Sequence, residues 1–332
     1  MSPRLRALSL LLLAVRSACL AVATEVTWPT SLDLRAVRAP EDYLQPTVSG
    51  RLESALFGMV REDGRRFHEG VDIRPTARDA AGEALDEVRA AMDGTVAYAN
   101  AVVNGPYGRY VVLTHLGAEL PVYTLYAHLA ALAPGVKVGA FVSRGTRLGR
   151  LGRSSAGATP ITPDRAHLHF ETGLILSTGF NQWYAAQPEN RRSPNLHGLF
   201  NGQNLIGMDP TPLLARSRVD LLELHRKQPV AATVTLRAAK TPDFVRRHPM
   251  LAHGDTLRAA GWHVEFSWQG MPLRWTALEA GHPRLPPGRW QLVGVDPTRR
   301  DQLIRRQMLA ADGRSAGELL RQNVEILLTT AR

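Results

Sequence analysis

The chain has 332 residues, 44% of them hydrophobic, and its 40 lysines and arginines outnumber its 30 aspartates and glutamates. This length suits roughly two domains, and the hydrophobic fraction excludes a mostly disordered chain. Cys19 is the only cysteine. An intrachain disulfide and a zinc site built from several thiolates are therefore excluded, and a metal site must use histidine and carboxylate ligands.

The net charge of +10 and the isoelectric point near 10.4 favour an anionic partner. The sequence contains no nucleic-acid-binding motif, so we do not expect nucleic acid as that partner. An exported protein with this charge would meet the anionic cell envelope. The arginine usage of a GC-rich genome would produce the same charge, which therefore selects no function by itself.

Residues 1–23 have the three parts of a secretory signal peptide. Two arginines give a positively charged start, residues 7–15 form an apolar run, and A-V-A at 21–23 offers a cleavage site. We therefore expect an exported protein, either periplasmic or extracellular.

The same segment leaves two alternatives open. An uncleaved anchor is one, but the apolar run is short for a bilayer and Arg16 interrupts it. No stable membrane span is expected after signal cleavage. Lipidation of Cys19 is the other alternative, although Arg16 stands where a lipoprotein signal requires an aliphatic residue.

Residues 24–48 contain three prolines and little periodicity, which predicts an extended lead-in. Short alternating runs separated by glycines follow, and they predict an all-β, mostly antiparallel domain over residues 49–216. Its strands are expected within 88–100, 108–117, 120–129, 135–152 and 166–173, with a hairpin turn at Asp93-Gly94. Residues 174–207, rich in Asn, Gly, Pro and Gln, predict a long loop of the same domain.

Residues 217–332 predict a second, β-rich accessory domain, and a β-sandwich is one form that it could take. Strands are expected within 230–239, 261–270 and 288–296, with a helix near 299–311 and a terminal strand in V-E-I-L-L-T-T (324–330).

The stretch H-L-H-F-E (167–171) carries two histidines in what reads as a buried strand. Because alternate residues of a strand share a face, His167, His169 and Glu171 point the same way. Two imidazoles on one face can bind a metal, move protons or serve as ordinary polar residues.

Two further stretches place similar groups opposite an apolar face. In R-F-H-E-G-V-D-I (66–73), His68 and Asp72 share a face, and Gly70 between them would leave room for an ion. In T-L-Y-A-H-L (124–129), His128 lies on the polar face. Imidazole or carboxylate on three separate strands favours a metal site.

The first of these stretches also permits a helical interpretation. H-E-G-V-D nearly matches the H-E-x-x-H motif of helical zinc peptidases, in which Glu69 would act as the base. However, Asp72 replaces the second histidine, and Gly70 disfavours a helix interior by about 1 kcal/mol. We therefore prefer a strand, with Glu69 facing solvent.

Four motifs occur in one order along the chain: F-H-E-G-V-D (67–72), D-G-T-V (93–96), Y-A-H-L (126–129) and H-L-H-F-E (167–171). With these motifs the chain resembles the lysostaphin/LytM-type zinc metallopeptidases, whose fold is the duplicated hybrid motif. The resemblance runs from about Ser49 to Leu214.

The resemblance implies roles for five residues. His68, Asp72 and His169 would bind one Zn²⁺ per chain and leave the fourth position to water, while His128 and His167 would be catalytic. It also implies a zinc metalloendopeptidase that hydrolyses the peptide cross-links of bacterial peptidoglycan.

The segment after His169 is longer than the link usual in that family. We expect residues 174–207 to form a wall or lid of the groove, with Trp183 and Tyr184 contacting substrate. The alternative is that the two aromatic side chains only pack this loop against the domain.

Other functions stay open. The chain could be a catalytically silent LytM-like regulator of cell-wall amidases, although such proteins typically lose ligands and here every ligand position is filled. It could also be a peptidase with a protein substrate, or a zinc-binding adhesion protein that binds through its C-terminal domain.

Overall fold

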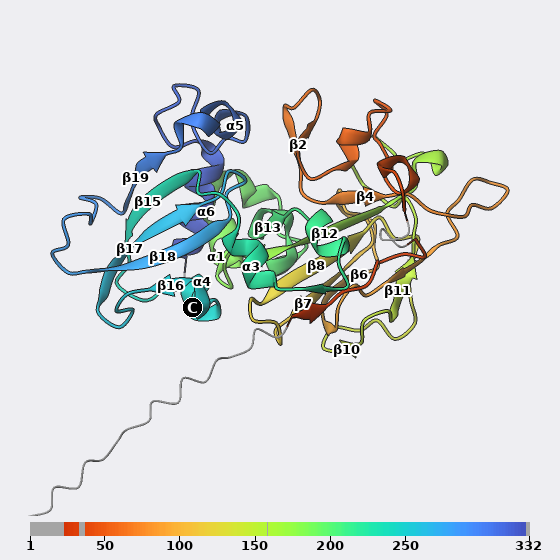
Figure 1. Ribbon diagram of the computed structural model, residues 1–332, viewed down its shortest axis with the longest axis horizontal. Coiled ribbons are helices and arrows are strands. Elements are labelled where there is room, and N and C mark those ends of the chain that lie inside the picture. Colours follow the sequence, from red (N-terminus) through yellow and green to blue (C-terminus); the bar gives the residue numbers. More distant parts are fainter. Residues whose placement is uncertain (1–22, 33–36, 158, 330–332) are drawn as a thin grey trace, which may run out of the picture.

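The computed structural model describes residues 23–32, 37–157 and 159–329, so residues 1–22 of the expected signal peptide, Cys19 among them, lie outside the described part of the chain. Two sheet-bearing regions lie side by side (Figure 1), one built from the first two thirds of the chain and one from the last third. Among the described residues, no helix combines the length and apolarity that a membrane crossing requires.

The largest sheet has seven strands, all antiparallel, in the order β10-β6-β7-β8-β12-β13, with β4 paired to the first half of β12. Its members are β4 (Val71–Ile73), β6 (Gly94–Asn100), β7 (Tyr110–His115), β8 (Val122–Ala127), β10 (Phe141–Val142), β12 (Leu168–Ile175) and β13 (Leu205–Met208). Strand β8 is buried along its whole length because both of its faces are covered. The all-β, mostly antiparallel prediction is confirmed for this region.

Smaller sheets flank the large one. A three-stranded sheet has the order β5-β11-β9, β2 pairs with β3, and β1 pairs with β14. These strands are β1 (Thr24–Glu25), β2 (Gly58–Arg61), β3 (Arg66–His68), β5 (Glu87–Arg89), β9 (Ala131–Leu132), β11 (Arg147–Arg150) and β14 (Arg218–Val219).

The hairpin predicted at Asp93-Gly94 is wrong. Strand β5, before this dipeptide, pairs with β11, whereas β6, after it, pairs with β7 and β10. The Asp93 carbonyl accepts a hydrogen bond from the His115 ring (2.7 Å), and its carboxylate accepts one from the Arg144 backbone (2.6 Å). These long-range bonds make the dipeptide a corner between two sheets.

The lead-in packs against the large sheet. Val26, Trp28 and Leu44 are buried, and the Gln45 backbone N–H donates to the Asp72 carbonyl (2.9 Å). The chain thereby reaches the edge of the histidine-bearing strands at residues 46–49.

The last third of the chain contains one five-stranded sheet, ordered β16-β18-β17-β15-β19, in which only β16 and β18 run parallel. Its strands are β15 (Ala232–Arg237), β16 (Ala252–His253), β17 (Ala259–Phe266), β18 (Pro272–Glu279) and β19 (Trp290–Val295). The helices of the whole chain are α1 (Phe180–Ala186), α2 (Thr211–Leu214), α3 (Leu221–Arg226), α4 (Asp243–Arg247), α5 (Arg300–Arg305) and α6 (Glu318–Leu328).

Helices occupy the place where a sandwich would have its second sheet. Phe244 of α4 stacks on Trp275 of β18, and Asn323 of α6 donates to the Gly270 carbonyl (3.1 Å). The β-sandwich expected as one form of this region is therefore wrong for the described residues. The terminal strand expected in V-E-I-L-L-T-T is wrong too, since most of it lies in α6.

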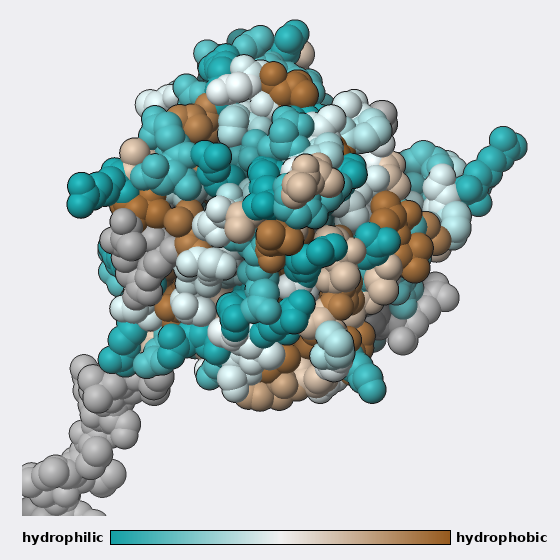
Figure 2. Space-filling model, turned by 90° about the vertical axis from the view of Figure 1, so that its right-hand side faces the viewer, coloured by the Kyte–Doolittle hydropathy of each residue, from teal (hydrophilic) through white to brown (hydrophobic). Residues whose placement is uncertain are grey.

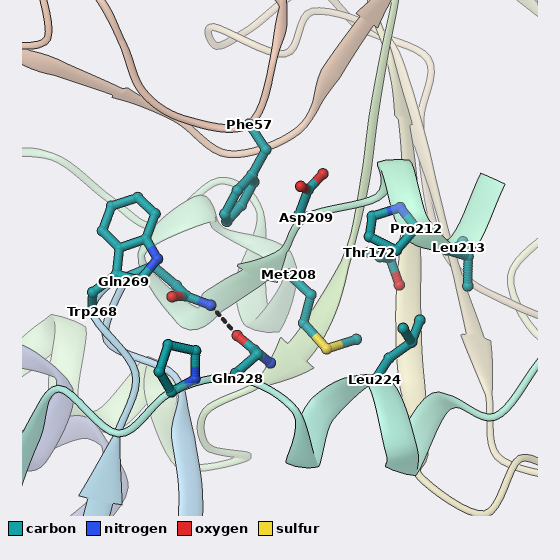
Figure 3. A pocket seen from close by; sticks show the side chains of 11 residues that line it. Phe57, Thr172, Met208, Asp209, Pro212, Leu213, Leu224, Gln228, Trp268 and Gln269 are labelled. Carbon is teal, nitrogen blue, oxygen red and sulfur yellow. Dashed lines mark hydrogen bonds between the residues drawn. The ribbon is translucent and has the colours of Figure 1, made fainter. Parts of the chain in front are cut away.

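Side chains from both regions meet at their junction. The Trp268 ring contacts the rings of Phe57 and Phe67 edge to face, and the Arg306 guanidinium lies 3.8 Å from the Phe67 ring centroid. Beside these contacts is a pocket of about 250 Å³, which Figure 3 shows with a hydrogen bond between Gln228 and Gln269. One buried apolar cluster contains residues from both sheets.

Candidate metal centre

Three strands bring one donor atom each to a single point. His68 ends β3, Asp72 is the middle residue of β4, and His169 faces Asp72 across the β4–β12 pair. His68 Nε2 lies 3.1 Å from Asp72 Oδ1 and 3.0 Å from His169 Nδ1, and His169 Nδ1 lies 3.0 Å from Asp72 Oδ1. All three side chains are buried.

This donor set fits a divalent cation. Zinc bonds of 2.0–2.1 Å in a tetrahedral site hold neighbouring donors about 3.3 Å apart, close to the spacing here. The other polar atom of each residue is also bound: His68 Nδ1 donates to the Leu56 carbonyl (2.7 Å), and Asp72 Oδ2 accepts from Arg61. Each ligand is thus fixed in orientation by an outer partner, as in known metal sites.

Glu171 fixes the third ligand. His169 Nε2 donates to Glu171 Oε1 (2.8 Å), and the carboxylate also accepts from the hydroxyls of Tyr107 (2.6 Å) and Tyr123 (2.9 Å). Burial raises the pKa of Glu171, but the hydrogen bonds from His169 and the two tyrosines outweigh burial and lower its pKa overall. The alternation of H-L-H-F-E already put Glu171 on this face, whereas nothing in the sequence pattern pointed to the tyrosines.

We expect Glu171→Gln to weaken zinc binding by roughly 10- to 100-fold. The amide carries no negative charge, and it is this charge that makes His169 a stronger ligand for the metal. Competition against a zinc-binding dye measures this change. Glu189→Gln makes the same substitution at an exposed carboxylate and should bind zinc like the wild type. Equal affinity in both variants would mean that Glu171 does not tune the site.

His128 and His167 form a second pair beside the donors. Their ring centroids lie 4.8 Å apart, and His167 Nε2 is 3.6 Å from Asp72 Oδ1. His128 Nδ1 donates to the Ser154 carbonyl (2.9 Å), and His167 Nδ1 donates to the Arg165 carbonyl (2.7 Å). Because a carbonyl can only accept, each neutral ring keeps its proton on Nδ1 and leaves the Nε2 lone pair free.

The pKa values of this pair favour the neutral form. Burial, followed by the charges of His167 and His169, lowers the pKa of His128 well below its usual range. Burial also lowers the pKa of His167, against the opposing effect of the Asp72 carboxylate. Both imidazoles are therefore neutral near neutral pH, and each has an unprotonated Nε2.

A turn after β8 directs His128 toward the donors. Its backbone φ of +61° lies in the left-handed region, which is uncommon for a residue other than glycine. Its backbone N–H donates to the Tyr107 carbonyl (3.0 Å), and its own carbonyl accepts from the Ser154 N–H (3.3 Å). The surrounding loops thus hold a conformation that costs free energy and gives the imidazole its direction.

A groove of about 690 Å³ opens onto these residues. Of the five predicted site residues, Asp72, His128, His167 and His169 line it, and His68 lies behind them with no exposed surface. Its walls are formed by the lead-in, by the hairpin of β2 and β3, and by residues 155–157 and 159–161.

Trp183 and Tyr184 lie elsewhere. Both belong to α1; Trp183 is 8% exposed and packs on Phe180, and its indole nitrogen is 3.4 Å from a carboxylate oxygen of Glu325 in α6. Neither aromatic residue lines the groove. This placement favours the packing role that the sequence left as an alternative.

The helical zinc-peptidase interpretation is excluded, because residues 66–73 form β3 and β4 rather than a helix. Glu69 is partly buried and lines the groove, so the expectation that it simply faces solvent is wrong. The space predicted beside Gly70 is also wrong: a Cβ atom there would lie 2.2 Å from the Phe170 carbonyl oxygen. Gly70 is needed for the close approach of β4 to β12.

Two other histidines have structural partners. The buried His115 ring bonds to the Asp93 carbonyl and to Thr124 Oγ1 (2.8 Å), and His197 bonds to the Tyr98 hydroxyl (3.0 Å). Among the described residues, the His68–Asp72–His169 group is the one set of three or more potential ligands that could share a metal.

Residues 66–177 match the model of Peptidase family M23. The match spans about a third of the chain and contains all five predicted site residues. The resemblance drawn from the sequence motifs is thereby confirmed for this region at the level of Peptidase family M23, to which residues 66–177 are similar.

Several solved structures are similar to parts of the chain. One is described as a proposed glycyl-glycine endopeptidase LytM from Ruminococcus gnavus (22% identity, TM-score 0.35), where the similarity covers 59% of this chain and 62% of that one. The catalytic domain of lysostaphin from Staphylococcus simulans (20% identity, TM-score 0.28) covers 49% of this chain and 88% of its own length. For a zinc-containing peptidase from Vibrio cholerae (22% identity, TM-score 0.27), the similarity covers 45% of this chain and 37% of that one. No curated protein matches the chain.

Proposed function

We propose that this protein is an exported zinc metalloendopeptidase that hydrolyses the peptide cross-links of bacterial peptidoglycan. The observation that carries the proposal is the convergence on one groove of three buried metal donors and two anchored neutral imidazoles. The family match to residues 66–177 supports the peptidase class, and it is the basis for peptidoglycan as the substrate.

His68, Asp72 and His169 would hold the zinc ion. A zinc ion bound here would polarise the scissile carbonyl and lower the pKa of water. The free Nε2 of His128 or His167 would accept the proton of the attacking water, since both rings face the donors. Once protonated, the same nitrogen becomes a donor that can stabilise negative charge on the carbonyl oxygen.

The proposal also gives a role to each of the larger segments of the chain. Residues 1–23 would be removed on export, residues 49–216 would form the peptidase domain, and residues 217–332 would serve as an accessory domain. The basic net charge would favour the anionic envelope.

The first test uses purified residues 24–332. We expect about one zinc per chain by elemental analysis, and release of soluble fragments from purified peptidoglycan. A chelator should abolish release, and added zinc should restore it. Bound zinc without release would favour the amidase regulator or a protein substrate, and absence of zinc binding would refute the proposal.

A further inference from the structure

The groove contains one arginine that forms no ion pair with a described residue. Of its three arginines, Arg61 pairs with Asp72, and Arg66 pairs with Glu62 at 3.3 Å. Arg165 forms no ion pair and no side-chain hydrogen bond with any residue that the structure describes. Of the three groove arginines, Arg165 is therefore the one whose guanidinium is not paired with a carboxylate.

Arg165 is also partly desolvated. Its Nε atom is buried and has no hydrogen-bond partner within the described residues. A buried donor without a partner destabilises the folded protein, and more so when the group is charged. Because Arg165 lines the groove, a carboxylate held there would provide a partner for this partly desolvated charge.

The position of Arg165 ties it to the reacting centre. It ends a short 3₁₀ helix (Pro163–Arg165), and its carbonyl anchors His167 Nδ1 at 2.7 Å. Both side chains line the same groove two residues apart along the chain. A group held by Arg165 therefore lies near the atoms on which His167 acts.

A guanidinium presents parallel N–H donors that match the two oxygens of a carboxylate. We propose that Arg165 recognises a free carboxylate on one of the two residues joined by the cleaved bond. The inference rests on the proposed peptidase function and narrows its substrate. It favours stem-peptide cross-links with a carboxylate beside the scissile bond over neutral glycine bridges.

Three synthetic dimers of stem peptides test this inference. The first carries a free carboxylate next to the cleaved bond, the second carries a carboxamide at the same place, and the third is joined through glycines. We expect wild-type kcat/KM to be at least tenfold higher for the carboxylate dimer than for the other two. Arg165→Gln should reduce this ratio to near one, and Arg165→Lys should restore part of it.

The control variant is Arg258→Gln, which removes the same charge from an arginine whose side chain is 77% exposed. It should keep the wild-type ratio, which separates direct recognition from the overall charge of the protein. Equal cleavage of the carboxylate and carboxamide dimers by the wild type would overturn the inference, as would an unchanged ratio in Arg165→Gln.

Binding separates this inference from the proposed function. Fluorescently labelled carboxylate and carboxamide dimers are titrated with each protein, and anisotropy gives Kd without any cleavage. Tighter binding of the carboxylate dimer by the wild type, lost in Arg165→Gln, supports recognition even if no peptide is hydrolysed. Equal Kd values for both dimers would refute it even if hydrolysis occurs.

Discussion

Replacing His169 by alanine is expected to remove both the bound zinc and the peptidase activity, whereas His128→Ala should keep the zinc and still lose activity. The reason is geometric, since His169 Nδ1 is one of three converging donors and His128 is anchored to Ser154 beside them. Loss of a general base costs typically 10²- to 10⁴-fold in rate. His167→Ala should behave like His128→Ala.

Zinc content by elemental analysis and fragment release from peptidoglycan are measured on the same preparations. His253→Ala is the matched control, because this exposed histidine belongs to β16, in the other sheet. It should match the wild type in both measurements. Retention of full zinc content by His169→Ala, or loss of zinc in His128→Ala, would contradict the division of roles proposed for the two residues.

The substitution Gly70→Ala should destabilise the protein by roughly 3 kcal/mol or more, because overpacking against backbone cannot be relieved by a rotamer change. The new Cβ would lie 2.2 Å from the Phe170 carbonyl oxygen and 2.9 Å from its carbon. Relief requires β4 and β12 to separate, which moves Asp72 away from His169. Zinc affinity should fall together with stability.

Urea unfolding measures the loss of stability, and dye competition measures zinc affinity. Gly117→Ala is the control, since its Cβ would have no neighbour within 4 Å and its φ is ordinary. It should be neutral or slightly stabilising, because alanine restricts the unfolded chain. Similar unfolding midpoints for the two variants would show that the contact at Gly70 is not tight.

The candidate site was predictable where the information is local. Period-two alternation placed His167, His169 and Glu171 on one face, and the bond between His169 and Glu171 agrees with it. The carbonyls of Leu56 and Ser154, which orient His68 and His128, come from loops that no pattern marks. Their roles depend on tertiary contacts between distant segments.

The fold was predictable to a similar extent. Strands β7 and β8 followed from short alternating runs, whereas β18 was not expected. The segment 324–330 resembled a strand because of its β-branched residues, yet its apolar residues continue a helical spacing with Leu320, Val324 and Leu327 buried on one side. Packing of these apolar residues against the region of the five-stranded sheet favours the helix over the strand.

The contact between Phe67 and Arg306 joins the two sheet-bearing regions, so it decides whether the first region can be separated from the second. Phe67 immediately precedes a proposed zinc ligand, and its ring is covered by a guanidinium and an indole from the last third of the chain. Burial lowers the pKa of Arg306 to about 10, and the nearby Glu69 carboxylate opposes that shift. A fragment ending near residue 216 would expose these aromatic rings to water and leave Glu69 without its cation. The proposed accessory domain therefore helps to support the candidate metal centre and is not a structurally independent unit.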